Sequence, residues 1–185
     1  MLTFVTLTNN ELIMKKILFA LFALMAVMTV QAQSICGTWR TMQPVVETDE
    51  DGSFSAQSYT YTFNEDGTFN LVNELTESSQ PAPTMALEIA CSIELSGTYT
   101  LDGDQLTLTP DINTYKPEVL SVSMNGKVTE DPMVINNIKS MLNSPMAKAE
   151  FSQPETNTIR LADPMLEMIN EDVTLTLSRF ATINN

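Results

Sequence analysis

The stretch MALEIACSIELSGTYTL, Met85 to Leu101, alternates apolar and polar side chains along its whole length. A period of two is that of a β-strand with one buried and one solvated face. Gly97 is the position at which a bend or bulge costs least. The stretch predicts one long strand, or two joined by a bend, with this apolar set on one face: Met85, Leu87, Ile89, Cys91, Ile93, Leu95, Gly97, Tyr99 and Leu101.

Hairpins are predicted on both sides of this strand. Asp102-Gly103 separates it from the alternating run QLTLT, and Asp-Gly between such runs is a strong hairpin signal. Upstream, the runs SYTYTF and TFNLVNEL surround the turn 64–67, which also ends in Asp-Gly. Further strand candidates are the run that begins at Cys36, Glu118 to Met124, Lys148 to Gln153, Thr158 to Leu161 and Val173 to Phe180.

One helix, 132–143, is predicted between these strands. Asp131 can cap it, Pro132 fits the first helical position, and apolar residues follow at helical spacing. We expect a shorter helical turn at 163–170 and a loop at 76–83. About eight or nine short strands with one apolar parity each indicate an all-β, antiparallel barrel or sandwich.

The N-terminal region has the layout of a secretory signal. Met14-Lys15-Lys16 is followed by the apolar run ILFALFALMAVMTV and by Val30-Gln31-Ala32, which fits a cleavage site. The run is shorter than the ~20 apolar residues that a membrane-spanning helix needs. We expect an unused upstream start at 1–13, a signal peptide at 14–32 and one domain at 33–185, exported to the periplasm or secreted.

Charge and composition exclude several classes of function. The chain has 23 acidic and 9 basic side chains, a formal net charge of -14 and no histidine. Such a surface repels phosphate backbones, so no nucleic-acid partner is expected. Without histidine, Ser-His-Asp, Cys-His and zinc-histidine chemistry is excluded. No catalytic motif, cofactor site or metal site is predicted, and only a hydrolase based on paired carboxylates stays open.

The two cysteines, Cys36 and Cys91, allow more than one interpretation. Gln33, Ser34 and Ile35 do not match a lipobox, because bulky Ile35 stands where a small residue is required, so lipid anchoring through Cys36 is not expected. In an exported protein an even number of cysteines favours a disulfide. Cys91 also lies on the apolar parity of its strand and could be a plain core thiol. Both alternatives stay open.

Gly37-Thr38-Trp39 at the first strand, the hairpins YTFNEDGTF and GTYTLDGDQLTLT, and the final LTLSRF together resemble the lipocalin-like proteins of the calycin group. The resemblance implies an up-and-down β-barrel of about eight strands, here with the helix 132–143 inserted before the last strands. It also implies that Trp39 packs across the closed end against Arg179, a structural pair. Val173, Leu175, Leu177 and Arg179 share one parity, which favours the same pairing.

The function expected from this fold is non-enzymatic binding of one small hydrophobic molecule inside the barrel of a monomer. A second resemblance, to small secreted META-type domains, implies instead a packed structural or interaction module whose acidic surface binds a cationic or envelope protein. The pocket candidates are the inward-facing residues Tyr59, Tyr61, Phe63, Phe69, Leu71, Leu87, Ile89, Ile93, Leu95, Tyr99, Leu120, Val122 and Met124.

Overall fold

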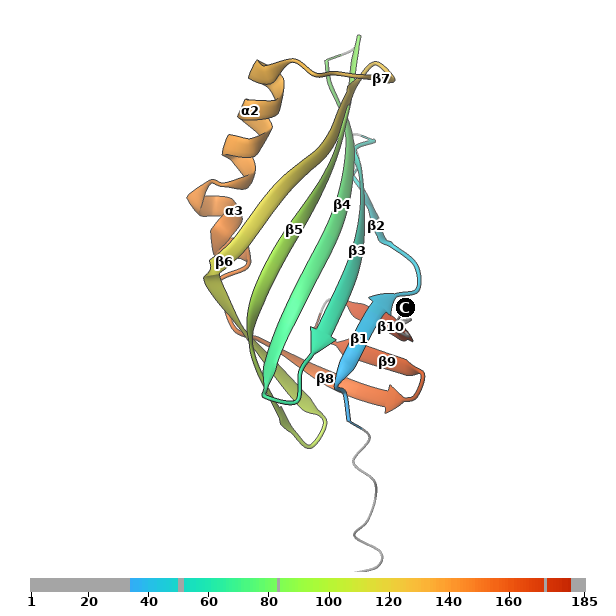
Figure 1. Ribbon diagram of the computed structural model, residues 1–185. Coiled ribbons are helices and arrows are strands. Elements are labelled where there is room, and N and C mark those ends of the chain that lie inside the picture. The colour runs from blue at the N-terminus through green and yellow to red at the C-terminus, as the bar shows by residue number, and fades with distance from the viewer. Residues whose placement is uncertain (1–33, 50–51, 83, 172, 181–185) are drawn as a thin grey trace, which may run out of the picture. The chain divides into compact units, whose positions relative to one another are not determined.

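A computed structural model of the chain describes residues 34–49, 52–82, 84–171 and 173–180 (Figure 1). The expected upstream segment 1–13 and signal peptide 14–32 lie outside these residues. The chain divides into two units, 1–34 and 35–185, and every element discussed below belongs to the second.

The described residues of this unit form ten strands and two helices. In chain order they are β1 (Gly37–Thr41), β2 (Val45–Thr48), β3 (Phe54–Phe63), β4 (Thr68–Ala82), β5 (Met85–Asp102), β6 (Gln105–Met124), β7 (Lys127–Val128), α2 (Pro132–Leu142), α3 (Pro145–Glu150), β8 (Glu155–Ala162), β9 (Met165–Ile169) and β10 (Thr174–Phe180). None of the helices in the described ranges is long and apolar enough to cross a membrane.

Eight of the strands form a closed antiparallel ring. The order is β1-β10-β9-β8-β6-β5-β4-β3, and β1 pairs with β3 as well as with β10, which closes the circuit. β2 pairs with β3 and β7 with β6, outside the ring. Because strands that follow one another in the ring also follow one another along the chain, the topology is up-and-down. The all-β barrel prediction is confirmed, including the helix inserted before the last strands.

The ring is closed at one end only. β3 to β6 contain 10, 15, 18 and 20 residues, whereas β8, β9 and β10 contain 8, 5 and 7. β6 pairs with β8 only over Gln105–Leu108. The long strands therefore continue beyond the short ones, and α2 and α3 lie along β6 in this extended half (Figure 1). We call the part that contains the short strands the closed end.

Side chains fill the closed end. Trp39, Leu106, Leu166 and Leu177 are fully buried, and Phe63 and Phe69 are 1% exposed. They belong to one apolar cluster that draws on strands from the whole ring. Closely packed protein interiors hold their side chains in fixed positions. The closed end is thus a hydrophobic core.

A bulge between β5 and β6 marks the junction of the closed end and the extended half. Glu94 pairs with Lys116 and Ser96 with Asp111. Between these two pairs, β6 advances by five residues and β5 by only two. The Lys116 and Glu94 side chains approach to 3.9 Å across the exposed surface. A bulge of this kind bends the strand and changes which parity faces inward. Accordingly, Leu106 and Leu108 are buried before the bulge and Tyr115 after it.

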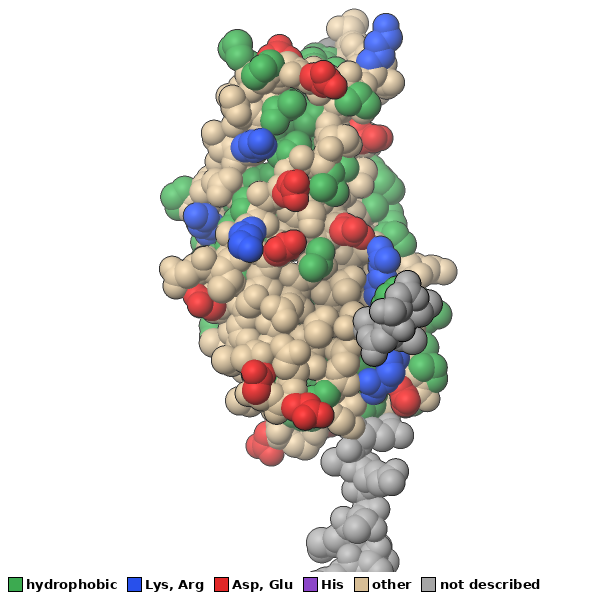
Figure 2. All heavy atoms as spheres, in the orientation of Figure 1, with side chains coloured by type: hydrophobic (Ala, Val, Ile, Leu, Met, Phe, Trp, Pro, Cys, Tyr) green, Lys and Arg blue, Asp and Glu red, His purple; other side chains and the backbone are tan. Residues whose placement is uncertain are grey.

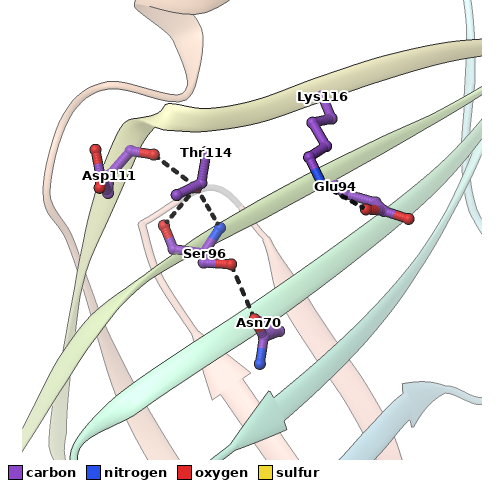
Figure 3. A network of polar contacts seen from close by, with 6 residues as sticks. All are labelled: Asn70, Glu94, Ser96, Asp111, Thr114 and Lys116. Carbon is purple, nitrogen blue, oxygen red and sulfur yellow. Dashed lines mark hydrogen bonds and ion pairs between the residues drawn. The ribbon is translucent and has the colours of Figure 1, made fainter.

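Thr114 satisfies the backbone groups that the bulge leaves unpaired (Figure 3). Its hydroxyl accepts from the Ser96 N–H at 2.8 Å and lies within donating distance of the carbonyl oxygens of Asp111, at 2.7 Å, and Ser96, at 3.2 Å. The Ser96 hydroxyl donates to Asn70 Oδ1 on β4 at 2.8 Å. Since unpaired backbone groups cost free energy, this network stabilises the bend.

Three local predictions are wrong. Segment 148–153 was expected as a strand, but its first half belongs to α3 and no strand forms there, because Ser144 caps a helix whose first residue is Pro145. Segment 163–170 was expected as a helical turn, but it contains β9, in which Leu166 and Met168 alternate inward. Segment 76–83 was expected as a loop, but β4 continues to Ala82, paired with β3 up to Ser78 and with β5 as far as Ala82. The predicted helix itself is confirmed, with Asp131 accepting from the Met133 N–H.

Candidate functional site

A pocket of about 580 Å³ lies between the long strands and the helices α2 and α3. We call it the strand-helix pocket. β2 to β6 provide one side, and the end of α2, α3 and the residue after it provide the other. Most ligand-binding pockets have volumes of about 300–1,000 Å³, so this one is large enough for a small organic molecule.

Apolar side chains form much of the wall of this pocket: Phe54, Leu75, Ile93, Tyr115, Leu142 and Phe151. The Tyr115 hydroxyl donates to the Leu142 carbonyl at 2.9 Å, and its ring centroid is 5.6 Å from that of Phe151. One tyrosine of β6 thus fixes the ends of both helices. Burial raises the pKa of Tyr115, with smaller contributions from Cys91 and Glu150. This hydroxyl therefore stays protonated and continues to donate.

A polar network of three side chains lies on the strand side of the pocket. Gln57 Oε1 accepts from the Tyr59 hydroxyl at 2.7 Å and from Asn73 Nδ2 at 3.2 Å. Asn73 is 2% exposed, and within the described part of the chain its Oδ1 has no hydrogen-bond partner. Gln57 and Asn73 both line the pocket. An unpaired buried acceptor costs about 1–3 kcal/mol, which a ligand N–H or O–H would recover.

Four carboxylates also line the pocket, and they come from three separate parts of the chain. Glu47 and Asp49 lie in and just after β2, Glu77 in β4 and Glu150 at the end of α3. No lysine or arginine is among the described residues that line it. Nor do the described residues contain three potential metal ligands close enough to hold an ion. The site is a partly apolar pocket with a negative lining.

Aromatic rings continue from the pocket into the core along the inner face of β3. Tyr59 stacks on Tyr61 with centroids 6.4 Å apart, and Tyr61 on Phe63 at 5.8 Å. Phe63 then meets Tyr99 of β5 edge to face at 5.1 Å. Burial is the main cause that raises the pKa of Tyr59 and of Tyr99 to about 12 each, and it raises that of Tyr61 further.

Stability is expected to fall as the pH rises above about 10. Tyrosine in the unfolded chain ionises near pH 10, whereas the folded state holds the Tyr59 and Tyr99 protons to about pH 12. Between these values the unfolded state binds fewer protons, so the free energy of unfolding decreases with pH. This contribution is complete below about pH 10 and is lost through about pH 12. Urea unfolding at about pH 8 and pH 11 measures it, and equal stability at both would contradict it.

The structure brings Trp39 and Arg179 together in the closed end. They are direct partners across the β1–β10 ladder, and the guanidinium carbon lies 4.2 Å from the Trp39 ring centroid. Arg179 also donates to the Cys36 carbonyl and to Asp163 Oδ1, each at 2.7 Å. Trp39 Nε1 donates to the Ile35 carbonyl at 2.6 Å. The contacts of both side chains are with the protein itself, as expected of a structural pair.

The backbone conformation and surroundings of Gly37 explain why the Gly-x-Trp motif begins with glycine. Its φ is +122°, a region that side chains with a Cβ rarely adopt. A Cβ at this position would also lie 2.7 Å from Arg179 Nη1. The missing side chain therefore provides the room through which the guanidinium reaches the Cys36 carbonyl.

The structure does not bring the two cysteines together. Cys36 Sγ lies 3.5 Å from the Tyr99 hydroxyl, and Cys91 lies eight positions before Tyr99 on β5, or ~26 Å along a strand. A disulfide needs Cα atoms within about 7 Å of each other. Cys91 is 2% exposed, and burial raises the pKa of its thiol. The core-thiol alternative is therefore the one that the geometry of Cys91 supports.

The predicted pocket residues occupy several places. Ile93 lines the strand-helix pocket, while Tyr61, Phe69, Leu71 and Leu95 line a small cavity of about 70 Å³ beside it. Phe63, Tyr59 and Tyr99 are buried in the core or packed against it, and Val122 is buried elsewhere. Leu87, Ile89 and Met124 are half-buried toward the far end of β5 and β6. Leu120 is 55% exposed and was wrongly placed, because β6 has a second bulge between Val119 and Ser121.

The sequence-based list missed Asn73 and Gln57, although a signal for both was present. In TFNLVNEL, Asn73 shares the parity of Phe69, Leu71 and Leu75, and Gln57 shares that of Tyr59 on the paired strand. Amide side chains that interrupt two paired apolar faces indicate a buried polar site. The contribution of α3 was also missed, because segment 148–153 was predicted to be a strand.

Comparison with known proteins assigns the family. The family model of the lipocalin-like domain matches residues 35–135, which is more than half of the chain. No match was found among curated proteins. The matched region contains β1 to β6, and with them most of the strand side of the pocket. Proteins with this domain have a fold compatible with ligand binding and are generally not enzymes. The chain belongs to the lipocalin-like domain family.

Proposed function

We propose that the protein is an exported, non-enzymatic binding protein that holds one small molecule with an apolar body in the strand-helix pocket. The observation that carries the proposal is the pocket of about 580 Å³ with its six apolar side chains, next to a core that is itself filled. The site was expected inside the barrel, whereas the proposed site lies in the extended half of the strands. A filled closed end leaves no room for a ligand of that size.

Apolar burial would supply most of the affinity. Each CH₂ group transferred from water contributes about 0.8 kcal/mol, so an alkyl chain of about eight carbons gains roughly 6 kcal/mol before the cost of association. Phe54, Leu75 and Phe151 would contact such a chain. The Tyr59–Gln57–Asn73 network would fix the polar end of the ligand.

The alternative, a packed module that binds a cationic or envelope protein through its acidic surface, has less support. Figure 2 shows acidic and basic side chains interspersed on the face that it presents, and no single acidic patch there. The pocket supports the carrier hypothesis instead. Partner capture that is lost on addition of salt would favour the alternative.

Plugging the pocket tests the proposal. Ala147 lines the pocket from α3, and Ala147→Trp would fill part of it with an indole. The matched control is Met146→Trp, because Met146 is the preceding residue and is 84% exposed. The probe is N-phenyl-1-naphthylamine, a neutral apolar dye whose fluorescence rises in apolar sites.

We expect the dye to bind the wild type and Met146→Trp equally, and Ala147→Trp at least about tenfold more weakly. Mass spectrometry of an organic extract of the purified protein would identify a co-purified ligand. Absence of dye binding to the wild type, together with an empty extract, would overturn the proposed function. Unchanged affinity in Ala147→Trp would place the dye elsewhere and count against this pocket.

A further inference from the structure

The negative lining and the unpaired amide oxygen together restrict the chemical class of the ligand. We infer that the strand-helix pocket binds an organic cation, a molecule with an apolar body and a protonated amine whose N–H donates to Asn73 Oδ1. The inference rests on the proposed function and deepens it. It departs from the expectation of a purely hydrophobic ligand.

The hydrogen bonds around Gln57 determine what is missing at Asn73. Gln57 Oε1 already accepts two bonds, from Tyr59 and from Asn73 Nδ2. Asn73 Oδ1 is then the one acceptor in this network without a donor in the described residues, and Asn73 is 98% buried. A donor on a bound ligand would complete this network. Hydrogen bonds from a charged donor are the stronger ones, which favours an ammonium over a hydroxyl.

The carboxylates supply the charge that such a donor needs. Glu47, Asp49, Glu77 and Glu150 approach the pocket from β2, β4 and α3, with no basic residue among its described lining. The field of two of them reaches the polar network, because Glu47 and Glu150, after burial and the nearby Glu155, add to raising the pKa of Tyr59. A negative field at a hydrogen-bond acceptor attracts a cation and repels a carboxylate.

The spacing of the acids favours an organic cation over a metal ion. The described residues contain no group of three acidic or cysteine side chains that could hold a metal. Spread around an apolar pocket, the carboxylates suit a cation whose charge lies at one end of a larger body. The apolar wall formed by Leu75, Ile93 and Phe151 would hold the rest of that body.

Competition among three ten-carbon ligands tests the class. Decylamine, decanol and decanoate, each below its micellar concentration, would compete with N-phenyl-1-naphthylamine for the wild-type protein. We expect decylamine to bind at least about tenfold more tightly than decanol, and decanoate to bind more weakly than decanol. Raising NaCl from about 0.05 to 0.5 M should reduce the preference for the amine and leave decanol unchanged.

The outcomes separate this inference from the proposed function. Equal displacement by all three ligands would overturn the cation class and leave the proposed function standing. Tighter binding of decanoate would also overturn it, because the amides of Asn73 and Gln57 would then be turned round to present Asn73 Nδ2 to the ligand. Failure of the dye and of all three ligands to bind would overturn the proposed function itself.

The variant Asn73→Leu removes the acceptor while keeping the size of the side chain. We expect its affinity for decylamine to fall at least about tenfold and its affinity for decanol to fall less, because a neutral O–H makes a weaker hydrogen bond than a charged N–H. The matched control is Asn70→Leu on the same strand, where the side chain is exposed and accepts from the Ser96 hydroxyl. It should leave both affinities unchanged.

A preference for the amine that survives in Asn73→Leu would overturn the inference. If Asn73→Leu does not fold, the double variant Glu77→Gln/Glu150→Gln decides, because both side chains are exposed and line the pocket. It should reduce the preference for decylamine over decanol by several-fold at low salt and have no effect at high salt. An unchanged preference at low salt would be the contrary result.

Discussion

Gly97→Ala is expected to lower the free energy of unfolding by about 3 kcal/mol. A Cβ on Gly97 would stand 2.7 Å from Phe69 Cε1, 2.9 Å from Pro110 Cα and still closer to the carbonyl oxygen of Thr109. Overpacking a core costs about 1–3 kcal/mol, and two of these three neighbours are backbone atoms that cannot turn aside. The substitution should therefore fall at the upper end of this range. Urea unfolding followed by circular dichroism measures it.

The matched control for Gly97→Ala is Thr98→Ala. Thr98 is the next residue on β5 and is exposed, so its replacement should cost less than about 1 kcal/mol. If Gly97→Ala were as stable as the wild type, β5 and β6 would not approach one another so closely at the bulge. The described register around Ser96 and Asp111 would then be wrong.

Trp39→Ala is expected to cost about 3–5 kcal/mol, the range measured when a large aromatic side chain is removed from a core. Trp39 has no exposed surface, and its loss would leave a cavity beneath the Arg179 guanidinium and the Ile35 carbonyl without its donor. For a domain of this size, each kcal/mol lowers Tm by about 2–4 °C. Because Trp39 is the sole tryptophan, unfolding should be followed by circular dichroism.

Two further variants separate the contributions of Trp39. Trp39→Phe keeps an aromatic ring beneath Arg179 but removes the N–H that donates to Ile35, so it should cost less than Trp39→Ala. Phe180→Ala, one residue beyond Arg179 and 55% exposed, should change stability by less than about 0.5 kcal/mol. If Trp39→Ala cost no more than Phe180→Ala, the closed end would not depend on the tryptophan.

The strands could be predicted because alternation is a local property of the chain. Met85 to Leu101 corresponds to β5, and the turns at 64–67 and at Asp102-Gly103 join the strands that they were expected to join. Trp39 and Arg179 could be paired because a buried guanidinium needs a partner and the family resemblance named one. These features depend on few residues at a time.

The three wrong segments failed because the sequence around each is compatible with two structures. Thr76 to Ala82 contains mainly polar residues, yet β3 pairs with its first part up to Ser78 and β5 pairs with it as far as Ala82. Segment 163–170 was predicted to be a helical turn, but β8 and β10 offer this short segment partners on both edges, and Leu166 and Met168 alternate as in a strand. Ser144-Pro145 repeats the cap of the previous helix, Asp131-Pro132, and is a signal for α3 that the strand prediction at 148–153 overlooked.

The site was predictable only in part. The apolar inner face of β3 to β5 follows from parity, and Ile93, one of the predicted pocket residues, lines the strand-helix pocket. The acidic side chains, in contrast, come from β2, β4 and α3, and no local pattern indicates that Glu47 and Glu150 line one cavity. The change of inward parity at the bulges of β6 likewise depends on the partner strand, which explains the misplaced Leu120.

The join between β1 and β10 has a consequence for the order of folding. Thr38 pairs with Phe180, whereas most other neighbouring strands of the ring are joined by short connections. Bringing such distant segments together carries the largest entropic cost of loop closure in the ring, so this pairing depends on contacts that form earlier. Until β10 has left the ribosome, β1 has only β3 as a neighbour and β9 has an open edge. The growing chain therefore exposes two unpaired strand edges, which are prone to intermolecular pairing, until its last strand is made.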